Sequence, residues 1–262
     1  MHDAKMLRVK VLLTIVATSL LLSACGGSKT VLDQSQREQA ATYNYQLGVD
    51  YFRQGNFAQA KEKLERSLEQ DPRNAQTHMA AGLLYDRLGE QDNAESHFAR
   101  AASLDPKNPE LLNNYAVYLC RRGKYERGEK IALEAASDQL YKTPEAAWLN
   151  AGFCARDSGE LKRAEQHFRR ALAIQPRFAP VLLELADVQF RATQYLPARG
   201  FLERYSAAAP ATPASLWWGV RIERALGNEA QAGDYARRLR SEFPNADETR
   251  QLREAEVARP KR

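Results

Sequence analysis

The chain has 262 residues, of which 44% are hydrophobic, and its 38 basic and 33 acidic residues give a formal net charge of +5. That length accommodates one or two compact domains or one solenoid, and Ala and Leu dominate the apolar residues, which favours helix over sheet. The charges are dispersed, with no block of five of one sign, so we expect a solvated surface and no nucleic-acid partner.

Residues 1–24 have the pattern of a secretory signal peptide. Lys5, Arg8 and Lys10 form a positive segment, and an apolar segment follows at residues 11–22. A dozen apolar residues are too few to span a bilayer as a helix, but they suit the apolar part of a signal peptide.

The apolar segment ends in Leu22-Ser23-Ala24-Cys25, which resembles the bacterial lipobox. In that class of signal the cysteine thiol receives diacylglycerol and the peptidase cuts just before it. The resemblance implies a membrane anchor through lipid on Cys25; the alternative is an ordinary secretory signal with a chance cysteine. Gly26 stands where an Asp would resemble the inner-membrane retention signal, so we expect the inner leaflet of the outer membrane, with the protein facing the periplasm.

Residues 25–40 are predicted to form the lipidated cysteine and a flexible tether, because Gly26-Gly27-Ser28 and the residues after it are small or polar. No later segment is long and apolar enough to cross a membrane. We therefore expect the remainder to be a periplasmic body.

From residue 41 the sequence repeats with a period of 34 residues. Prolines at 72, 106, 176, 210 and 244 are 34 residues apart, except for one interval of 70, which is two periods and two residues. Glycines in the same register predict a tight turn in each repeat, with Thr193 as the exception: Gly55, Gly89, Gly123, Gly159 and Gly227. Small residues form two further series: Gly48, Gly82, Ala116, Gly152, Ala186 with Val220 as a weak member, and Ala60, Ala94, Gly128, Ala164, Ala198, Ala232.

This pattern resembles the tetratricopeptide repeat, a helical hairpin in which small residues let the two helices cross closely. The resemblance implies an all-α fold, a right-handed superhelical solenoid of six repeats. The two extra residues are placed near residues 137–143. The predicted repeats are 41–74, 75–108, 109–142, 145–178, 179–212 and 213–246, and residues 247–262 are predicted to be a capping helix and tail.

Local signals agree with these boundaries. Asn108-Pro109, Thr143-Pro144 and Thr212-Pro213 each place an N-cap residue before a proline at the first helical position. Pro197 is expected in the first turn of the second helix of repeat five, where its missing N–H has no cost.

In tetratricopeptide solenoids the first helices line a concave groove. Transferring the groove positions gives an apolar row interleaved with arginines, which suits a peptide with apolar anchors and acidic groups; the alternative is that the apolar row is core. Asn114 and Asn150 share the position at which some family members hold a peptide backbone, and exposed asparagines are an equal alternative. The predicted partner-binding groove is Tyr45, Val49, Phe52, Arg53, Met79, Leu83, Arg87, Asn114, Val117, Arg121, Asn150 and Phe153, and Leu149, Arg156, Phe190, Arg191, Trp217, Arg221 and Arg224 continue the stripe.

Catalytic patterns are not found. No metal-ligand spacing is found among His78, His97 and His167, and no phosphate loop or nucleophile motif occurs. We expect a binding scaffold and not an enzyme, with no cofactor, no metal and no small-molecule substrate.

Two cysteines, Cys120 and Cys154, fall on the first helices of neighbouring repeats. They could pair in an oxidising compartment, but their helical phases suggest that they face differently. Two separate buried thiols are the favoured interpretation, and pairing stays open.

With the lipobox and six repeats, the chain resembles the type IV pilus biogenesis and stability lipoproteins, the PilF/PilW family. The resemblance rests on Tyr45-Gln46-Leu47-Gly48, on Leu111-Leu112-Asn113-Asn114-Tyr115, and on the run from Leu185 to Arg199 that contains Tyr195-Leu196-Pro197-Ala198-Arg199. It implies a pilotin-like role: binding the outer-membrane secretin of the type IV pilus through the N-terminal repeats and assisting its localisation, multimerisation or stability. The alternative is a periplasmic adaptor for another envelope assembly, such as outer-membrane protein assembly or cell-wall enzymes.

Overall fold

The computed structural model describes residues 33–257, and within them the chain folds into helices joined by short turns, with no strand. Twelve of the helices form six consecutive hairpins, so the expected all-α solenoid of tetratricopeptide type is confirmed. We call the first helix of each hairpin helix A and the second helix B. The hairpins are α2 (Gln34–Arg53) with α3 (Phe57–Gln70), α4 (Ala75–Leu88) with α5 (Gln91–Leu104), α6 (Pro109–Arg121) with α7 (Tyr125–Ala136), α8 (Pro144–Asp157) with α9 (Leu161–Ile174), α10 (Ala179–Arg191) with α11 (Tyr195–Ala208), and α12 (Pro213–Ala225) with α13 (Glu229–Glu242); α14 (Asp247–Val257) ends the described chain.

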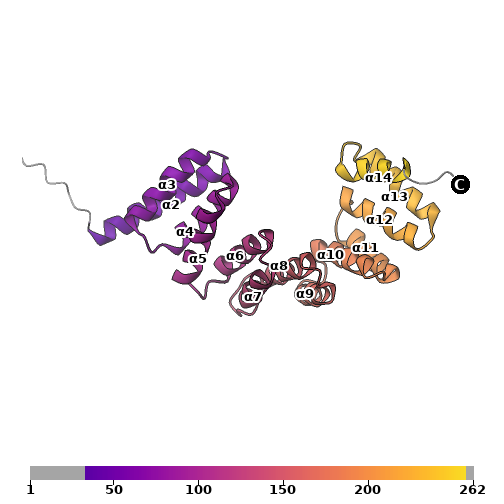
Figure 1. Ribbon diagram of the computed structural model, residues 1–262, viewed down its shortest axis with the longest axis horizontal. Coiled ribbons are helices and arrows are strands. Elements are labelled where there is room, and N and C mark those ends of the chain that lie inside the picture. The colour runs from indigo at the N-terminus through magenta and orange to yellow at the C-terminus, as the bar shows by residue number, and fades with distance from the viewer. Residues whose placement is uncertain (1–32, 258–262) are drawn as a thin grey trace, which may run out of the picture.

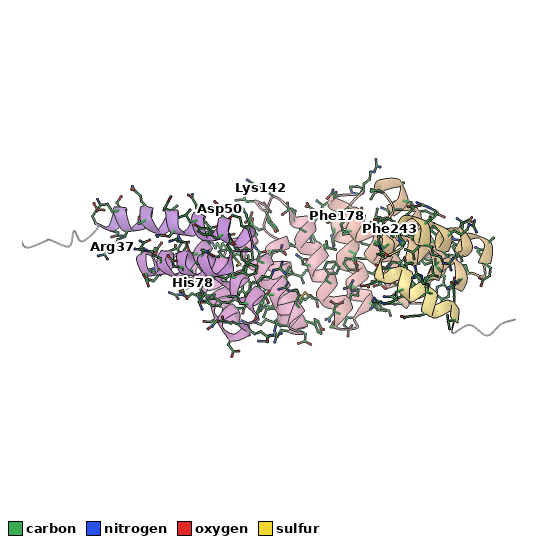
Figure 2. The ribbon with its side chains drawn as sticks, turned by 90° about the horizontal axis from the view of Figure 1, so that it is seen from above. Arg37, Asp50, His78, Lys142, Phe178 and Phe243 are labelled. Carbon is green, nitrogen blue, oxygen red and sulfur yellow. A yellow bond between two sulfur atoms is a disulfide. The ribbon has the colours of Figure 1, made fainter. Side chains whose placement is uncertain are left out.

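The hairpins follow one another along an arc whose two ends lie on the same side of its middle (Figure 1). Seen from above, the body is elongated, with Arg37 near one end and Phe243 near the other (Figure 2). Helix A contacts helix A of the next repeat at four of the five junctions, whereas no neighbouring B helices make a comparable contact in the described chain. The A helices therefore lie at the smaller radius, and we call the side they form the inner face. No described helix is long and apolar enough to cross a membrane.

In four of the six hairpins of the described chain, a large side chain of helix B lies against a glycine of helix A. A Cβ on Gly48 would lie 2.7 Å from Leu64 Cγ, and a Cβ on Gly82 would lie 3.0 Å from Phe98 Cγ. At Gly152 an added Cβ would overlap the ring of Phe168, which is fully buried. The missing side chains thus create the space that these large groups fill.

Repeat six uses a different residue for this contact. Val220 was predicted as the weak member of the small series, but a Cβ on Gly219 is the one that would lie 2.6 Å from the Tyr235 ring. Val220 itself is buried in a cluster with Leu216 and Leu239. The hairpin of repeat six therefore crosses one residue earlier than the 34-residue register indicates.

The predicted turns are confirmed. All five turn glycines have a positive φ, between 74° and 90°, and Thr193 at the sixth turn has φ 60°. A β-branched residue rarely adopts this left-handed conformation, which costs about 1–2 kcal/mol for a non-glycine residue. The turn in repeat five is therefore imposed by the packing of α10 against α11, not by local preference.

The helix starts agree with the capping signals, with one correction. Pro109, Pro144 and Pro213 each open a helix, and Asn108 accepts a hydrogen bond from the N–H of Leu111. The predicted flexible tether over residues 25–40 is wrong for residues 34–40, which are helical, while residues 25–32 lie outside the described range. The physical reason is a capping box, in which Asp33 accepts from the N–H of Gln36 at 2.8 Å and donates its own N–H to the Gln36 side chain at 3.1 Å.

The two extra residues lie where predicted, in the link 137–143 between α7 and α8. Within this link Leu140 is exposed, and Tyr141 turns inward to pack with Leu112 and Ala147. At the far end, Leu252 of α14 is fully buried in the cluster that contains Leu216. The predicted capping helix is thus present over Asp247–Val257, and residues 258–262 lie outside the described range.

The crossing geometry yields a paired prediction. We expect Gly152→Ala to lower the free energy of unfolding by about 1–3 kcal/mol, because the methyl group would overlap Phe168. Gly200→Ala, also inside a helix but with nothing within 4 Å of its added Cβ, should raise it by about 0.5–1 kcal/mol. Urea titration followed by circular dichroism measures both, and equal effects would contradict the close-approach argument.

Repeat two contains a pair of histidines that share a hydrogen bond. Nδ1 of His78 lies 3.0 Å from Nδ1 of His97, and the His97 ring stacks on Tyr85. One ring must donate and the other accept, so double protonation removes the bond. Burial lowers the pKa of His78, with Arg100 adding to the effect and the Pro72 carbonyl and Asp71 opposing it. Burial also lowers the pKa of His97, with His78 adding to the effect and Glu65 opposing it.

A lowered histidine pKa makes folding stability depend on pH. Below about pH 6.5 the two histidines bind protons more readily in the unfolded chain than in the folded chain. The contribution of the neutral pair to folding stability is therefore complete above that pH and decreases as the pH falls. We expect the denaturant midpoint to decrease between about pH 7 and pH 5, and to decrease less in the His97→Gln variant. If the denaturant midpoints of the parent protein and of the variant decrease in parallel with pH, the histidine pair does not contribute to the pH dependence of stability.

Candidate functional site

The N-terminal part of the inner face, on α2, α4 and α6, exposes apolar side chains. Leu83 is 36% exposed, and Val49 and Val117 are partly exposed. Tyr45 and Phe52 are partly buried and pack against a core cluster. This surface therefore combines accessible aliphatic groups with aromatic rings that the core holds in place.

Met79 does not belong to this surface. It was predicted as a groove residue, but it is only 4% exposed and lies in a core cluster with Tyr85 and Phe98. Because neighbouring A helices contact each other at the smaller radius, part of each groove-facing row is covered by the adjacent helix. A pattern based on one repeat does not contain that neighbour.

The polar residues of the same stripe differ in availability. Arg121 is ion-paired with Asp86 of the preceding helix A, and Nη1 of Arg53 lies 3.7 Å from Oδ1 of Asp50. Arg87 is exposed, with no ion pair among the described residues.

The two predicted asparagines are not equivalent. Asn114 is exposed, whereas Asn150 is partly buried and donates from Nδ2 to Asn113 Oδ1 at 2.9 Å. Asn150 thus joins α8 to α6, and Asn114 keeps its amide accessible on the inner face. Of the two, Asn114 is the one whose side chain is exposed.

The middle of the stripe is built around Phe153. Its ring packs edge-on against Phe168, and the guanidinium carbon of Arg156 lies 4.9 Å from its centroid. Arg156 also pairs with Glu184 of the next helix A. Burial raises the pKa of Glu184, and Arg156 opposes that rise. The charged groups in the middle of the stripe, Arg156 and Glu184, are therefore paired with each other.

The cysteines form a disulfide between Cys120 and Cys154, with their Cα atoms 5.3 Å apart, so the favoured interpretation of two separate thiols is wrong. Allowing for the two extra residues, Cys154 stands two positions earlier in its repeat than Cys120. Two residues turn about 200° around an α-helix. In the stack, the side of α6 that faces repeat four contacts the side of α8 that faces repeat three. Two cysteines that point in opposite directions from their own helices therefore meet at this junction.

Gly128 is explained by the same bridge. It stands in a series otherwise made of alanines, and a Cβ there would overlap the Cys120 sulfur. The absence of a side chain on α7 leaves room for the half of the disulfide that projects from α6.

The C-terminal part of the inner face contains an aromatic group that the sequence analysis only partly identified. Phe190 and Trp218 have ring centroids 5.4 Å apart, and Arg221 lies over both. Trp218 was missed, although it stands at the same repeat position as Asn114 and Asn150. This shared repeat position could have identified Trp218 as a residue of the inner face.

On other surfaces, a cavity of about 710 Å³ is lined by residues of α7 and α9, including Glu129 and Arg163. Glu129 is 7% exposed, and its Oε1 accepts a hydrogen bond from His167 Nε2 at 2.8 Å. Its Oε2 lies 3.6 Å from Nη2 of Arg163. These contacts join repeats three and four and explain the buried carboxylate without a ligand. Within residues 33–257, no group of three His, Cys, Asp or Glu side chains could hold a metal ion.

Comparison with known proteins places this architecture. Tetratricopeptide repeat models match residues 45–109, 97–130 and 155–221. The crystal structure of PilW, described as a widely conserved type IV pilus biogenesis factor, superposes with a TM-score of 0.76 at 31% identity, covering 82% of this chain and 98% of PilW. The chain belongs to the PilF/PilW family of type IV pilus biogenesis proteins.

Two further matches agree with the PilF/PilW assignment. The type IV pilus assembly protein PilF of Pseudomonas aeruginosa is 28% identical over 242 residues, which are 89% of this chain and 96% of that protein. The structure of Pseudomonas aeruginosa PilF superposes with a TM-score of 0.72 at 27% identity, covering 84% and 99% of the two chains. The likeness thus extends over nearly the full length of these relatives and is not confined to single repeats.

The disulfide closes a span of 34 residues, so its removal should be costly. We expect the Cys120→Ser/Cys154→Ser double variant to lose roughly 2–4 kcal/mol of unfolding free energy. Denaturant titration with and without reductant measures this loss: reductant should shift the parent protein to the midpoint of the double variant and leave the variant unaffected. A parent midpoint that ignores reductant would contradict a bridge that stabilises the fold.

Proposed function

We propose that this protein is an outer-membrane-anchored periplasmic scaffold of type IV pilus biogenesis. It binds the pilus secretin through the N-terminal inner face and assists the localisation, multimerisation or stability of the secretin without catalysing a reaction. The observation that carries the proposal is the match to PilW over 98% of its length, combined with accessible apolar side chains on the first three A helices.

The chemistry of that face suits a protein segment with apolar anchors. Leu83, Val49 and Val117 offer aliphatic surface on three successive A helices, and Asn114 offers an amide that can donate and accept beside Val117. Burying these aliphatic groups contributes affinity, and the amide pairs with main chain of any sequence. The face therefore favours an extended or helical peptide over a small ligand.

The anchor supports the same role. Leu22-Ser23-Ala24-Cys25 places the expected lipid nine residues before Gln34, where α2 begins. A chain of nine residues spans at most about 32 Å. Lipid on Cys25 would thus keep α2 and α4 near the membrane, where the effective concentration of a membrane-bound secretin is high.

A pair of variants tests the proposal in the native host. Leu83→Glu should reduce secretin oligomers, surface pili and twitching motility, because a charge on the exposed leucine opposes burial of the apolar anchor. Its matched control is Leu196→Glu on α11, where the leucine is 66% exposed but does not lie on an A helix. Equal loss in both variants, or in neither, would contradict a specific role of the inner face.

Cys25→Ser tests the anchor separately. The variant should fold, lose outer-membrane fractionation and support fewer secretin oligomers than the parent protein. Normal pili with an unlipidated protein would contradict tethered capture. If the secretin fails to co-purify with the parent protein and pili stay normal in a deletion strain, an adaptor role in another envelope assembly replaces the proposal.

A further inference from the structure

The inner face of repeats five and six presents one arginine in an unusual setting. The guanidinium carbon of Arg221, on α12, lies 4.3 Å from the ring centroid of Trp218 and 4.5 Å from that of Phe190 on α10. The ring planes of Phe190 and Trp218 are inclined by 60°, so the two rings form an aromatic corner around the cation. We call Phe190, Trp218 and Arg221 the aromatic corner.

Among the described residues, the arginine of the corner has no carboxylate partner. Five arginines in the described chain are partly buried, and four of them are ion-paired: Arg156, Arg199, Arg224 and Arg240. Arg221 is the fifth, and no hydrogen bond or ion pair to it is found among residues 33–257. A guanidinium has five N–H donors, so this side chain retains an unused set of donors.

The nearby acid of α10 does not meet this need. Asp187 Oδ1 accepts from Arg191 Nε at 2.6 Å, and Asp187 is only 4% exposed. Burial lowers the pKa of Arg221, with Arg191 adding to the effect and Asp187 opposing it. Arginine stays charged at neutral pH in spite of this, so the corner holds a partly desolvated cation whose donors have no acceptor among residues 33–257.

We propose that the aromatic corner is a second docking site, for an acidic peptide segment of a protein partner in which a carboxylate adjoins an aromatic side chain. The carboxylate receives two N–H bonds from the Arg221 guanidinium, a pairing for which the planar fork is suited. The neighbouring aromatic group packs against Phe190 and Trp218, whose rings already flank the cation.

Charge complementarity favours this occupant over a polyanion. Arg221 has no ion pair among residues 33–257, and Asp187 on α10, which is paired with Arg191, is the carboxylate that acts on it. A nucleic acid carries one phosphate after another and binds through several cations, whereas a peptide with a single acidic side chain needs only the one guanidinium of the corner.

The corner is separate from the face proposed to bind the secretin. Its residues lie on α10 and α12, toward the opposite end of the arc from α2 and α4 (Figure 1). One molecule can therefore bind two partner segments. The proposal for the aromatic corner does not depend on the proposal that the N-terminal inner face binds the secretin.

The test uses the detergent-solubilised full-length protein and two pools of dye-labelled, end-capped peptides. One pool has a central Asp-Phe pair with randomised uncharged flanks, and the matched pool has Asn-Phe. Fluorescence anisotropy should show the Asp-Phe pool binding about tenfold tighter or more, because hydrogen bonds to a charged group are strong. Partial quenching of the protein's tryptophan emission should accompany binding, because Trp218 lines the corner.

Variants assign the effect to the corner. Arg221→Gln should remove the difference between the two pools, and Arg221→Lys should retain part of it because the charge stays while the planar fork is lost. Arg170→Gln is the control, since Arg170 is an exposed arginine of α9, outside the inner face, with no ion pair among the described residues. It should leave binding unchanged.

Three results would overturn the proposal: equal binding of both pools, undiminished selectivity in folded Arg221→Gln, or tighter binding of a labelled oligonucleotide than of the Asp-Phe pool. Circular dichroism confirms that each variant is folded. The Leu83→Glu variant separates the two sites, because it should lose the secretin and keep the Asp-Phe selectivity.

Discussion

The contact on which this structure depends is the close crossing of the two helices in each hairpin. Where helix A carries glycine, as at Gly82 and Gly152, a phenylalanine of helix B fills the space that a side chain would occupy. This crossing fixes each hairpin as a rigid unit, and the units stack with their A helices nearest to one another. The inner face is therefore assembled from six helices whose spacing no single repeat determines.

The inner face is divided into regions of different chemistry. Its N-terminal part exposes aliphatic groups such as Leu83, while in the middle Arg156 and Glu184 are ion-paired with each other. The C-terminal part holds a cation against two aromatic rings. The disulfide and the buried Tyr141 stabilise the junction of repeats three and four, where two extra residues interrupt the period. The two regions proposed to bind partner segments thus lie in different parts of one inner face.

Features that depend on local chemistry were predictable from the sequence. A turn that needs positive φ selects glycine, and a proline after an N-cap residue opens a helix, so α6 and α12 begin where these signals place them. Features between repeats were not predictable in this way. Met79 is buried in a cluster to which the next repeat contributes Leu111 and Tyr115. The phases of Cys120 and Cys154 could be interpreted only with the direction of stacking known. The capping box at Asp33 was a local signal that was overlooked.

The most direct measurement of the central claim is site-specific photocrosslinking in living cells. A photoreactive amino acid replaces Leu83 on the inner face in one strain and Leu196 on α11 in another, and the adducts are identified by mass spectrometry. The account predicts a secretin adduct from position 83 and none from position 196. Secretin adducts of equal yield from both positions, or none from position 83 in a piliated strain, would contradict it.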